Sequence, residues 1–198
     1  MPKHLVPGNV IVAPYSSTMI TIIQATNRAD SNTEFISRQV HDFLKTIYSA
    51  EINYVGMQDL PSEILHIDPY QEKGMPEKLK LIQDHSMIPA EKFIWISPEY
   101  NGSYPGVVKL FIDAISVRKC DETFAFKKSL LIGVTSGRSG NLRGLDHLSS
   151  ILVHMKSIIY PRLLPISRVH ELMDDKHSIV HDPTVKVLQD HLIGFVDF

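Results

Sequence analysis

Three short polar segments contain the residue types that bind a phosphorylated ligand, and each follows an apolar run. The first, residues 26–33, combines hydroxyls, amides and one arginine just before a helical pattern. A helix N-terminus offers free backbone N–H groups and a partial positive charge, which suit a phosphate. Thr26, Ser31 and Thr33 can add hydroxyl donors, and Arg28 can neutralise charge. By itself the segment is equally compatible with an ordinary helix cap and a solvated turn.

The second and third segments have the composition of loops that surround a flat ring. Residues 98–106 carry Tyr100 and Tyr104 with an asparagine and two glycines. Glycine lets backbone approach a planar ligand closely, and aromatic rings offer a stacking surface. Residues 135–141 contain two glycines, several hydroxyls, an arginine and Asn141, which can hydrogen-bond the polar rim of a ring. Because proline and glycine also punctuate ordinary loops, neither segment is decisive alone.

The elements that must position these loops alternate between strand and helix. Apolar runs predict strands at residues 19–23, 52–55, 93–96, 130–134 and 158–160. Helical spacing of apolar residues predicts helices between them and one at the end of the chain. Ser31 or Asn32 is a plausible N-cap of the first helix, and the helix after residue 106 is expected to bury Val107, Phe111 and Ile115.

Five strands alternating with helices predict a parallel sheet covered on both faces. In the strand order 2-1-3-4-5, strands one and three flank the point where the order reverses, and strand four lies next to it. Ligands of open α/β sheets bind outside the carboxyl ends of the strands at this point. The three polar loops follow strands one, three and four. We therefore predict a flavodoxin-like, doubly wound five-stranded sheet in a three-layer sandwich with one ligand site.

The bulk composition excludes several classes of protein. The 198 residues carry a net charge of −2 and no basic stripe, which argues against a nucleic-acid partner. There is no polybasic anchor and no apolar run near the roughly 20 residues that span a bilayer, so no membrane association is expected. The single cysteine, Cys120, excludes a disulfide scaffold and favours a reducing, cytoplasmic location.

Residues 1–18 do not fit the strand–helix plan, whereas residues 19–198 read as one domain. The first 18 residues precede the first strand and contain three prolines. Two hypotheses remain open. Met19 is the natural start of the protein, or the preceding residues form an arm that packs on a neighbour.

Other familiar site motifs are missing from the sequence. The first loop is neither a Walker loop nor G-x-G-x-x-G, so ATP binding and Rossmann-type NAD binding lose support. Ser136 does not lie in the G-x-S-x-G turn of a hydrolase. His177 and His181 have i, i+4 spacing, but the H-E-x-x-H pattern is absent and Pro183 follows, so we predict a surface pair and no metal site.

The middle loop carries a specific resemblance to a known family. The string at residues 98–106, PEYNGSYPG, followed by VVK and by Asp113 and Ala114, resembles the signature of the NAD(P)H-dependent FMN reductases. That family includes quinone, azo and chromate reductases. The resemblance extends from about residue 19 to residue 165. Ala25 stands where the family often has glycine, and Thr33 replaces the usual asparagine.

The resemblance implies a flavodoxin-like domain that binds FMN and forms a homodimer or homotetramer. It implies that three groups of residues contact the cofactor. The residues implied to bind the phosphate are Thr26, Arg28, Ser31, Asn32 and Thr33. Those implied to line the isoalloxazine are Pro98, Glu99, Tyr100, Asn101 and Gly102. Those implied to contact its other rim are Thr135, Ser136, Gly137 and Arg138.

The resemblance also implies a reaction. NAD(P)H would be the co-substrate, and hydride would pass through FMN to a small acceptor such as a flavin, a quinone, an azo compound or a metal oxyanion. Because the flavin carries the chemistry, no catalytic nucleophile is expected. The alternative is a flavodoxin-like electron carrier or a non-catalytic FMN-binding module, since fold alone does not decide function. Carriers are usually acidic, and the near-neutral charge disfavours that alternative.

Overall fold

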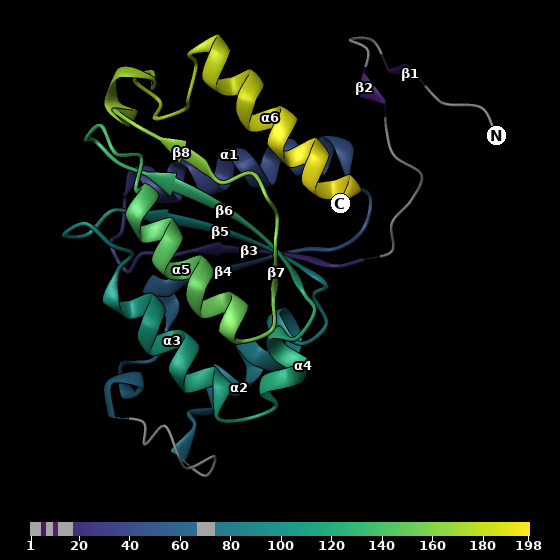
Figure 1. Ribbon diagram of the computed structural model, residues 1–198, viewed down its shortest axis with the longest axis vertical. Helices are drawn as coiled ribbons and strands as arrows, with labels where there is room; N and C mark the ends of the chain where they lie inside the picture. The colour runs from purple at the N-terminus through teal and green to yellow at the C-terminus, as the bar shows by residue number, and fades with distance from the viewer. Residues whose placement is uncertain (1–4, 7–9, 12–17, 67–73) are drawn as a thin grey trace.

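The computed structural model describes residues 5–6, 10–11, 18–66 and 74–198 (Figure 1). The strands of the main sheet are β3 (Ile20–Gln24), β4 (Ile52–Gly56), β5 (Lys92–Pro98), β6 (Lys128–Val134), β7 (Ile158–Ile159) and β8 (Leu164–Ile166). The long helices are α1 (Asn32–Ile47), α3 (Gly106–Ser116), α5 (Leu142–His154) and α6 (Asp182–Asp197). The shorter helical elements are α2 (Glu77–Ile82), α4 (Cys120–Phe124), η1 (Met57–Asp59), η2 (Ser62–His66), η4 (Gln83–Met87) and η5 (Val169–Glu171).

All pairings in the main sheet are parallel, and the neighbours run in the order β4-β3-β5-β6-β7. This is the predicted order 2-1-3-4-5. Ile22 in β3 pairs with Tyr54 on one side and Ile94 on the other. The loops that leave β3, β5 and β6 therefore emerge at the same edge of the sheet.

The fifth position in the sheet differs from the prediction, because two short strands share it. β7 pairs with the start of β6 and β8 pairs with its end. Pro161 lies between them and has no N–H group to continue the ladder. Pro165 within β8 is tolerated because this strand lies at the edge of the sheet.

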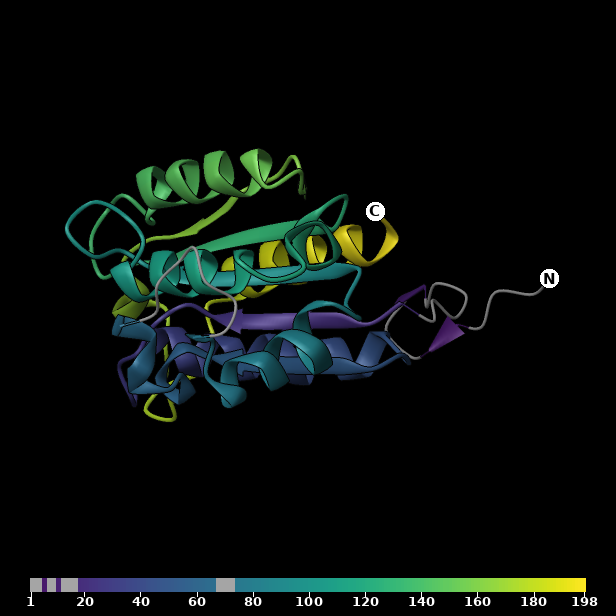
Figure 2. The ribbon, with the colours of Figure 1, turned by 90° about the horizontal axis from the view of Figure 1, so that it is seen from below.

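Alternation along the strands directs side chains into two apolar layers, one on each face of the sheet. Helices cover both faces (Figures 1 and 2). Phe93 and Trp95 of β5 pack with α3 and α5, whereas Ile94 and Ile96 pack with α1 and α6. Trp95 and Ile96 are fully buried. A strand covered on both faces explains why its sequence is apolar without interruption.

The sequence-based prediction is confirmed at the start of α1 and differs from the structure in α3 and α4. Ser31 is the N-cap of α1, and its Oγ accepts the Glu34 N–H at 3.2 Å, so the first cap candidate is confirmed. In α3, Phe111 and Ile115 are buried as expected, but Val107 is only half-buried and Val108 lies in the core instead. The short helix α4, which the sequence reading missed, follows α3 directly.

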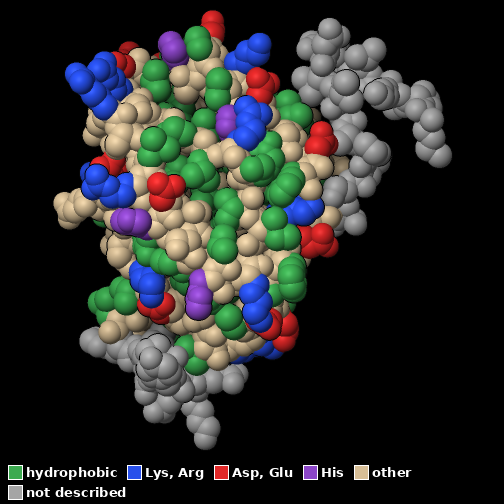
Figure 3. Space-filling model, in the orientation of Figure 1, with side chains coloured by type: hydrophobic (Ala, Val, Ile, Leu, Met, Phe, Trp, Pro, Cys, Tyr) green, Lys and Arg blue, Asp and Glu red, His purple; other side chains and the backbone are tan. Residues whose placement is uncertain are grey.

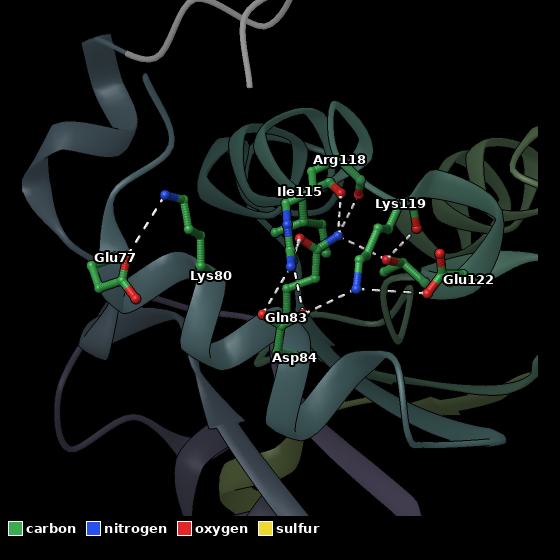
Figure 4. Close-up of polar contacts among 9 residues, drawn as sticks. Glu77, Lys80, Gln83, Asp84, Ile115, Arg118, Lys119 and Glu122 are labelled. Carbon is green, nitrogen blue, oxygen red and sulfur yellow. Dashed lines mark hydrogen bonds and ion pairs between the residues drawn. The ribbon is translucent and has the colours of Figure 1, made fainter. Parts of the chain in front are cut away.

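A buried glutamine joins α3 and α4 to the turn that follows α2 (Figure 4). The fully buried Gln83 side chain donates from Nε2 to the carbonyls of Ile115 and Arg118 at 2.7 and 2.6 Å and to Thr123 Oγ1 at 2.8 Å. Its Oε1 accepts from Arg118, whose guanidinium also forms two hydrogen bonds with Asp84. These contacts satisfy carbonyls at the end of α3 that the helix leaves free.

Residues 1–18 contain two short strands, β1 (Leu5–Val6) and β2 (Val10–Ile11), which pair antiparallel with each other. The other residues before Thr18 lie outside the described residues, and so do the prolines that motivated the two hypotheses on this segment. Among the helices in the described part of the chain, none combines the length and apolar character that crossing a bilayer requires.

Replacing Gln83 with Leu is expected to lower the free energy of unfolding by about 3 kcal/mol, because two buried carbonyls lose their donor. Urea denaturation followed by circular dichroism measures the change. Gln58→Leu, at an exposed position, is the matched control and is expected to change stability by less than about 0.5 kcal/mol. Equal stability of the two variants would contradict the role of Gln83.

Candidate functional site

The three polar loops meet at the carboxyl edge of neighbouring strands. Gln24 at the end of β3 pairs with Ile96 of β5, and Pro98 at the end of β5 pairs with Val134 at the end of β6. Loop 1 (residues 25–31), loop 2 (residues 99–105) and loop 3 (residues 135–141) follow these strands in turn. The structure therefore brings together the segments that contain Arg28, Tyr100 and Gly137.

Loop 1 is organised by the hydroxyl of Thr26. The Thr26 side chain is fully buried, and its Oγ1 accepts the Arg28 N–H at 3.2 Å. The same oxygen lies 2.8 Å from the Tyr100 hydroxyl, a hydrogen bond that joins loop 1 to loop 2. The Arg28 side chain is exposed, and no described residue forms an ion pair or hydrogen bond with its guanidinium. Loop 1 thus presents an uncompensated cation beside the start of α1.

The other predicted phosphate residues belong to the cap and first turn of α1. Ser31 uses its oxygen as the cap, as described above, while its hydroxyl proton remains available to a ligand. Asn32 and Thr33 open the helix; Asn32 is half-buried and Thr33 is 2% exposed. The Asp30 N–H donates to Glu34 Oε2 at 3.1 Å.

Loop 2 is a tight reverse turn. Tyr100 and Ser103 exchange backbone hydrogen bonds of 2.8 and 3.1 Å, and Asn101 and Gly102 between them have φ of 50° and 78°. Asn and Gly are the residues that accept this geometry at lowest cost. The turn exposes Asn101. Tyr104 was expected to offer a stacking surface, but its ring packs against the core, and burial raises its pKa.

Loop 3 exposes the residues that were predicted to meet a ring. Ser136, Gly137 and Arg138 are exposed, and Thr135 is half-buried with its Oγ1 accepting the Gly137 N–H at 3.0 Å. The loop is held from behind by the segment after β8, because the Arg168 N–H donates to the Gly137 carbonyl at 2.8 Å.

Asn141 has a different role from the one its sequence position suggested. Its side chain points into the protein, is 1% exposed, and donates to the carbonyls of Ser97 and Pro98 at 3.0 and 2.9 Å. A second link between loops 2 and 3 is the hydrogen bond from Ser139 to the carboxylate of Glu99. Asn141 and Glu99 therefore fix the relative position of the two loops.

Two further residues reach loop 2 from α5. A Cβ added at Gly102 would lie 2.9 Å from a guanidinium nitrogen of Arg143, so this side chain covers the turn. The His147 Nδ1 lies 2.9 Å from the Ser103 hydroxyl. The sequence reading did not connect Arg143 with loop 2, although its place in the first turn of the helix after loop 3 was a usable signal.

The described residues contain no group of three or more His, Cys, Asp or Glu side chains able to hold a metal ion. The predicted His177–His181 pair does not lie on one helix. His177 stacks on Phe35 with ring centroids 4.4 Å apart, and His181 is the residue before α6.

Removing the Asn141 amide is expected to destabilise the protein and loosen loops 2 and 3 together. Asn141→Ala leaves the carbonyls of Ser97 and Pro98 without their donor and is expected to cost about 2 kcal/mol in urea unfolding. Asn141→Asp is expected to cost more at neutral pH, because a carboxylate faces two carbonyl oxygens. If Asp were tolerated as well as Asn, the donor role would be wrong.

Comparison with known proteins identifies relatives of this chain. A family model described as NADPH-dependent FMN reductase matches residues 18–171. A quinone reductase of Escherichia coli is 31% identical over 153 residues, which are 76% of this chain and 79% of that protein. An NAD(P)H-dependent FMN reductase of Pseudomonas aeruginosa is 26% identical over 141 residues, which are 70% and 74% of the two chains.

Solved structures show the same fold at lower identity. A flavoenzyme NAD(P)H:(acceptor) oxidoreductase of Paracoccus denitrificans superposes with a TM-score of 0.72 and 23% identity, covering 92% of this chain and 96% of that one. An FMN-dependent NADH-azoreductase of Bacillus anthracis, solved in complex with FMN, gives 0.60 and 14%, with 89% and 98% covered. Since the family model spans most of the chain and includes all three loops, the chain belongs to the NADPH-dependent FMN reductase family.

Proposed function

We propose that this protein binds FMN at the carboxyl edge of β3, β5 and β6 and passes electrons from NADH or NADPH to a small acceptor. The observation that carries the proposal is the meeting of loops 1, 2 and 3 at one edge, joined by the Thr26–Tyr100 and Glu99–Ser139 hydrogen bonds. Membership of the family and the names of the relatives support the same chemistry.

The residues present fit FMN by their chemistry. The free guanidinium of Arg28, the hydroxyls of Ser31 and Thr33, and the first turn of α1 form a donor set for a phosphate. The turn at Asn101 and Gly102 and the exposed backbone of Ser136–Gly137–Arg138 can approach a planar ring from two sides.

The protein's contribution to the reaction is binding and orientation. The chemistry that bound FMN would supply is acceptance of a hydride and transfer of electrons to the acceptor. Loop 2 and loop 3 would fix the ring plane, and their backbone N–H groups are candidate donors to its polar edge. Arg143, which covers the turn at Gly102, would lie beside an acceptor or nicotinamide on the exposed side. No side chain is assigned as nucleophile or acid.

A homodimer or homotetramer in the cytoplasm is part of the proposal. Leu110 on α3 and Leu142 and Val153 on α5 are 37%, 47% and 57% exposed. Figure 3 views the side of the molecule that carries these helices and shows hydrophobic side chains spread between charged groups. Apolar side chains scattered in this way are ordinary on a protein surface, so the assembly is proposed from the resemblance to the family and not from these residues.

A spectroscopic experiment tests the activity. Purified protein supplied with FMN is expected to be yellow, and NADH or NADPH is expected to bleach it without oxygen, after which a quinone acceptor restores the colour. The absorbance at the visible maximum of oxidised flavin records FMN binding, bleaching by the nucleotide and recovery with the acceptor. Yellow protein that neither nucleotide bleaches would favour the electron-carrier alternative, and protein that refuses FMN would exclude both functions.

The Thr26–Tyr100 hydrogen bond is expected to support FMN binding. Tyr100→Phe and Thr26→Val should each weaken FMN binding about three- to tenfold, because loop 1 is no longer held against loop 2. The double variant should bind FMN no more weakly than the weaker-binding single variant, because both substitutions remove the same hydrogen bond. Fluorescence quenching of FMN measures the dissociation constants. Tyr104→Phe is the control on the same loop and is expected to bind FMN normally.

A further inference from the structure

A buried carboxylate lies in the turn of α1 to which the phosphate site has been assigned. The Glu34 side chain is only 8% exposed and belongs to the first turn of the helix. That turn supplies the free N–H groups and the partial positive charge that attract an anion. The chain therefore has a carboxylate of its own in the turn to which the ligand's phosphate is assigned.

The Glu34 carboxylate occupies one backbone donor of loop 1 that a phosphate could use, the N–H of Asp30. Its Oε2 accepts the Asp30 N–H at 3.1 Å, and its own N–H donates to Ser31 Oγ at 3.2 Å. Ser31 and Glu34 thus form a variant of the capping box, in which the carboxylate reaches back to the residue before the cap. A phosphate at this turn has to displace the carboxylate from Asp30 or bind with fewer backbone donors.

Arg38 compensates part of this charge. Its guanidinium lies 2.6 Å from Glu34 Oε1, one helical turn further on. The hydrogen bond and the charge of Glu34 raise the pKa of Arg38. The Arg38 side chain is 68% exposed, so solvent screens the pair and some of the negative charge remains effective at the first turn.

We propose that Glu34 competes with the FMN phosphate, so that this protein holds FMN chiefly through its ring and exchanges it readily. The inference rests on the proposed function, because it assigns the phosphate to loop 1 and α1. It follows that the protein discriminates weakly between FMN and riboflavin, which lacks the phosphate. FMN then acts as an exchangeable flavin rather than a permanently bound group.

The test compares the dissociation constants of FMN and riboflavin for the whole protein, measured by fluorescence quenching at fixed ionic strength. For the unchanged protein, the two values are expected to lie within about tenfold of each other. Glu34→Gln keeps the capping box but removes the charge, and should tighten FMN about tenfold while riboflavin is unchanged. Arg38→Met should have the opposite effect on FMN, because Glu34 loses its cation.

The control variant is Asp42→Asn, which changes the net charge equally on the exposed side of α1, about 12 Å along the helix from Glu34. It should alter FMN binding less than twofold. The proposal is overturned if Glu34→Gln leaves FMN binding unchanged, or if it changes FMN and riboflavin alike. If neither flavin binds any variant, the proposed function itself fails, which is a distinct result.

Discussion

The parallel register of β3, β5 and β6 is the constraint on which the site depends. Each strand ends at the same edge, so the segments that follow them must meet whatever their separation in the chain. Register alone does not set the positions of loop atoms. Side chains from the loops do this: the Thr26 hydroxyl meets Tyr100, and the Asn141 amide holds the carbonyls at the end of β5.

Close backbone packing allows loop 3 to turn back over the sheet. A Cβ at Gly133 would lie 2.1 Å from the Gly140 carbonyl oxygen, and a Cβ at Gly140 would lie 2.4 Å from the Cβ of Pro165. Gly140 also has a backbone φ of 60°, a conformation that residues other than glycine adopt only at an energetic cost. Gly133 and Gly140 therefore allow β6, loop 3 and β8 to lie close together.

The start of α1 has to satisfy two demands that oppose each other. A stable helix needs acceptors for its first N–H groups, and Ser31 provides one for Glu34, while the Glu34 carboxylate accepts the N–H of Asp30 just before the cap. An anion-binding site needs the same N–H groups to be free. The balance between these demands is set by electrostatics at one turn, and the exposed Arg28 and Arg38 both act on it.

The sequence by itself determined the first four strands of the sheet, its parallel order, two candidate caps for the first helix and the location of three polar loops. These are local properties, since apolar runs, helical spacing and turn residues depend on neighbours in the chain. Only the tertiary structure decided which way the polar side chains point. Asn141 turned inward because its acceptors, the carbonyls of Ser97 and Pro98 on β5, lie 44 and 43 residues earlier in the chain. The ring of Tyr104 packs against the core, which is also built from distant segments. The pairing of β8 with the end of β6 and the approach of Arg143 to Gly102 likewise depend on partners far along the chain.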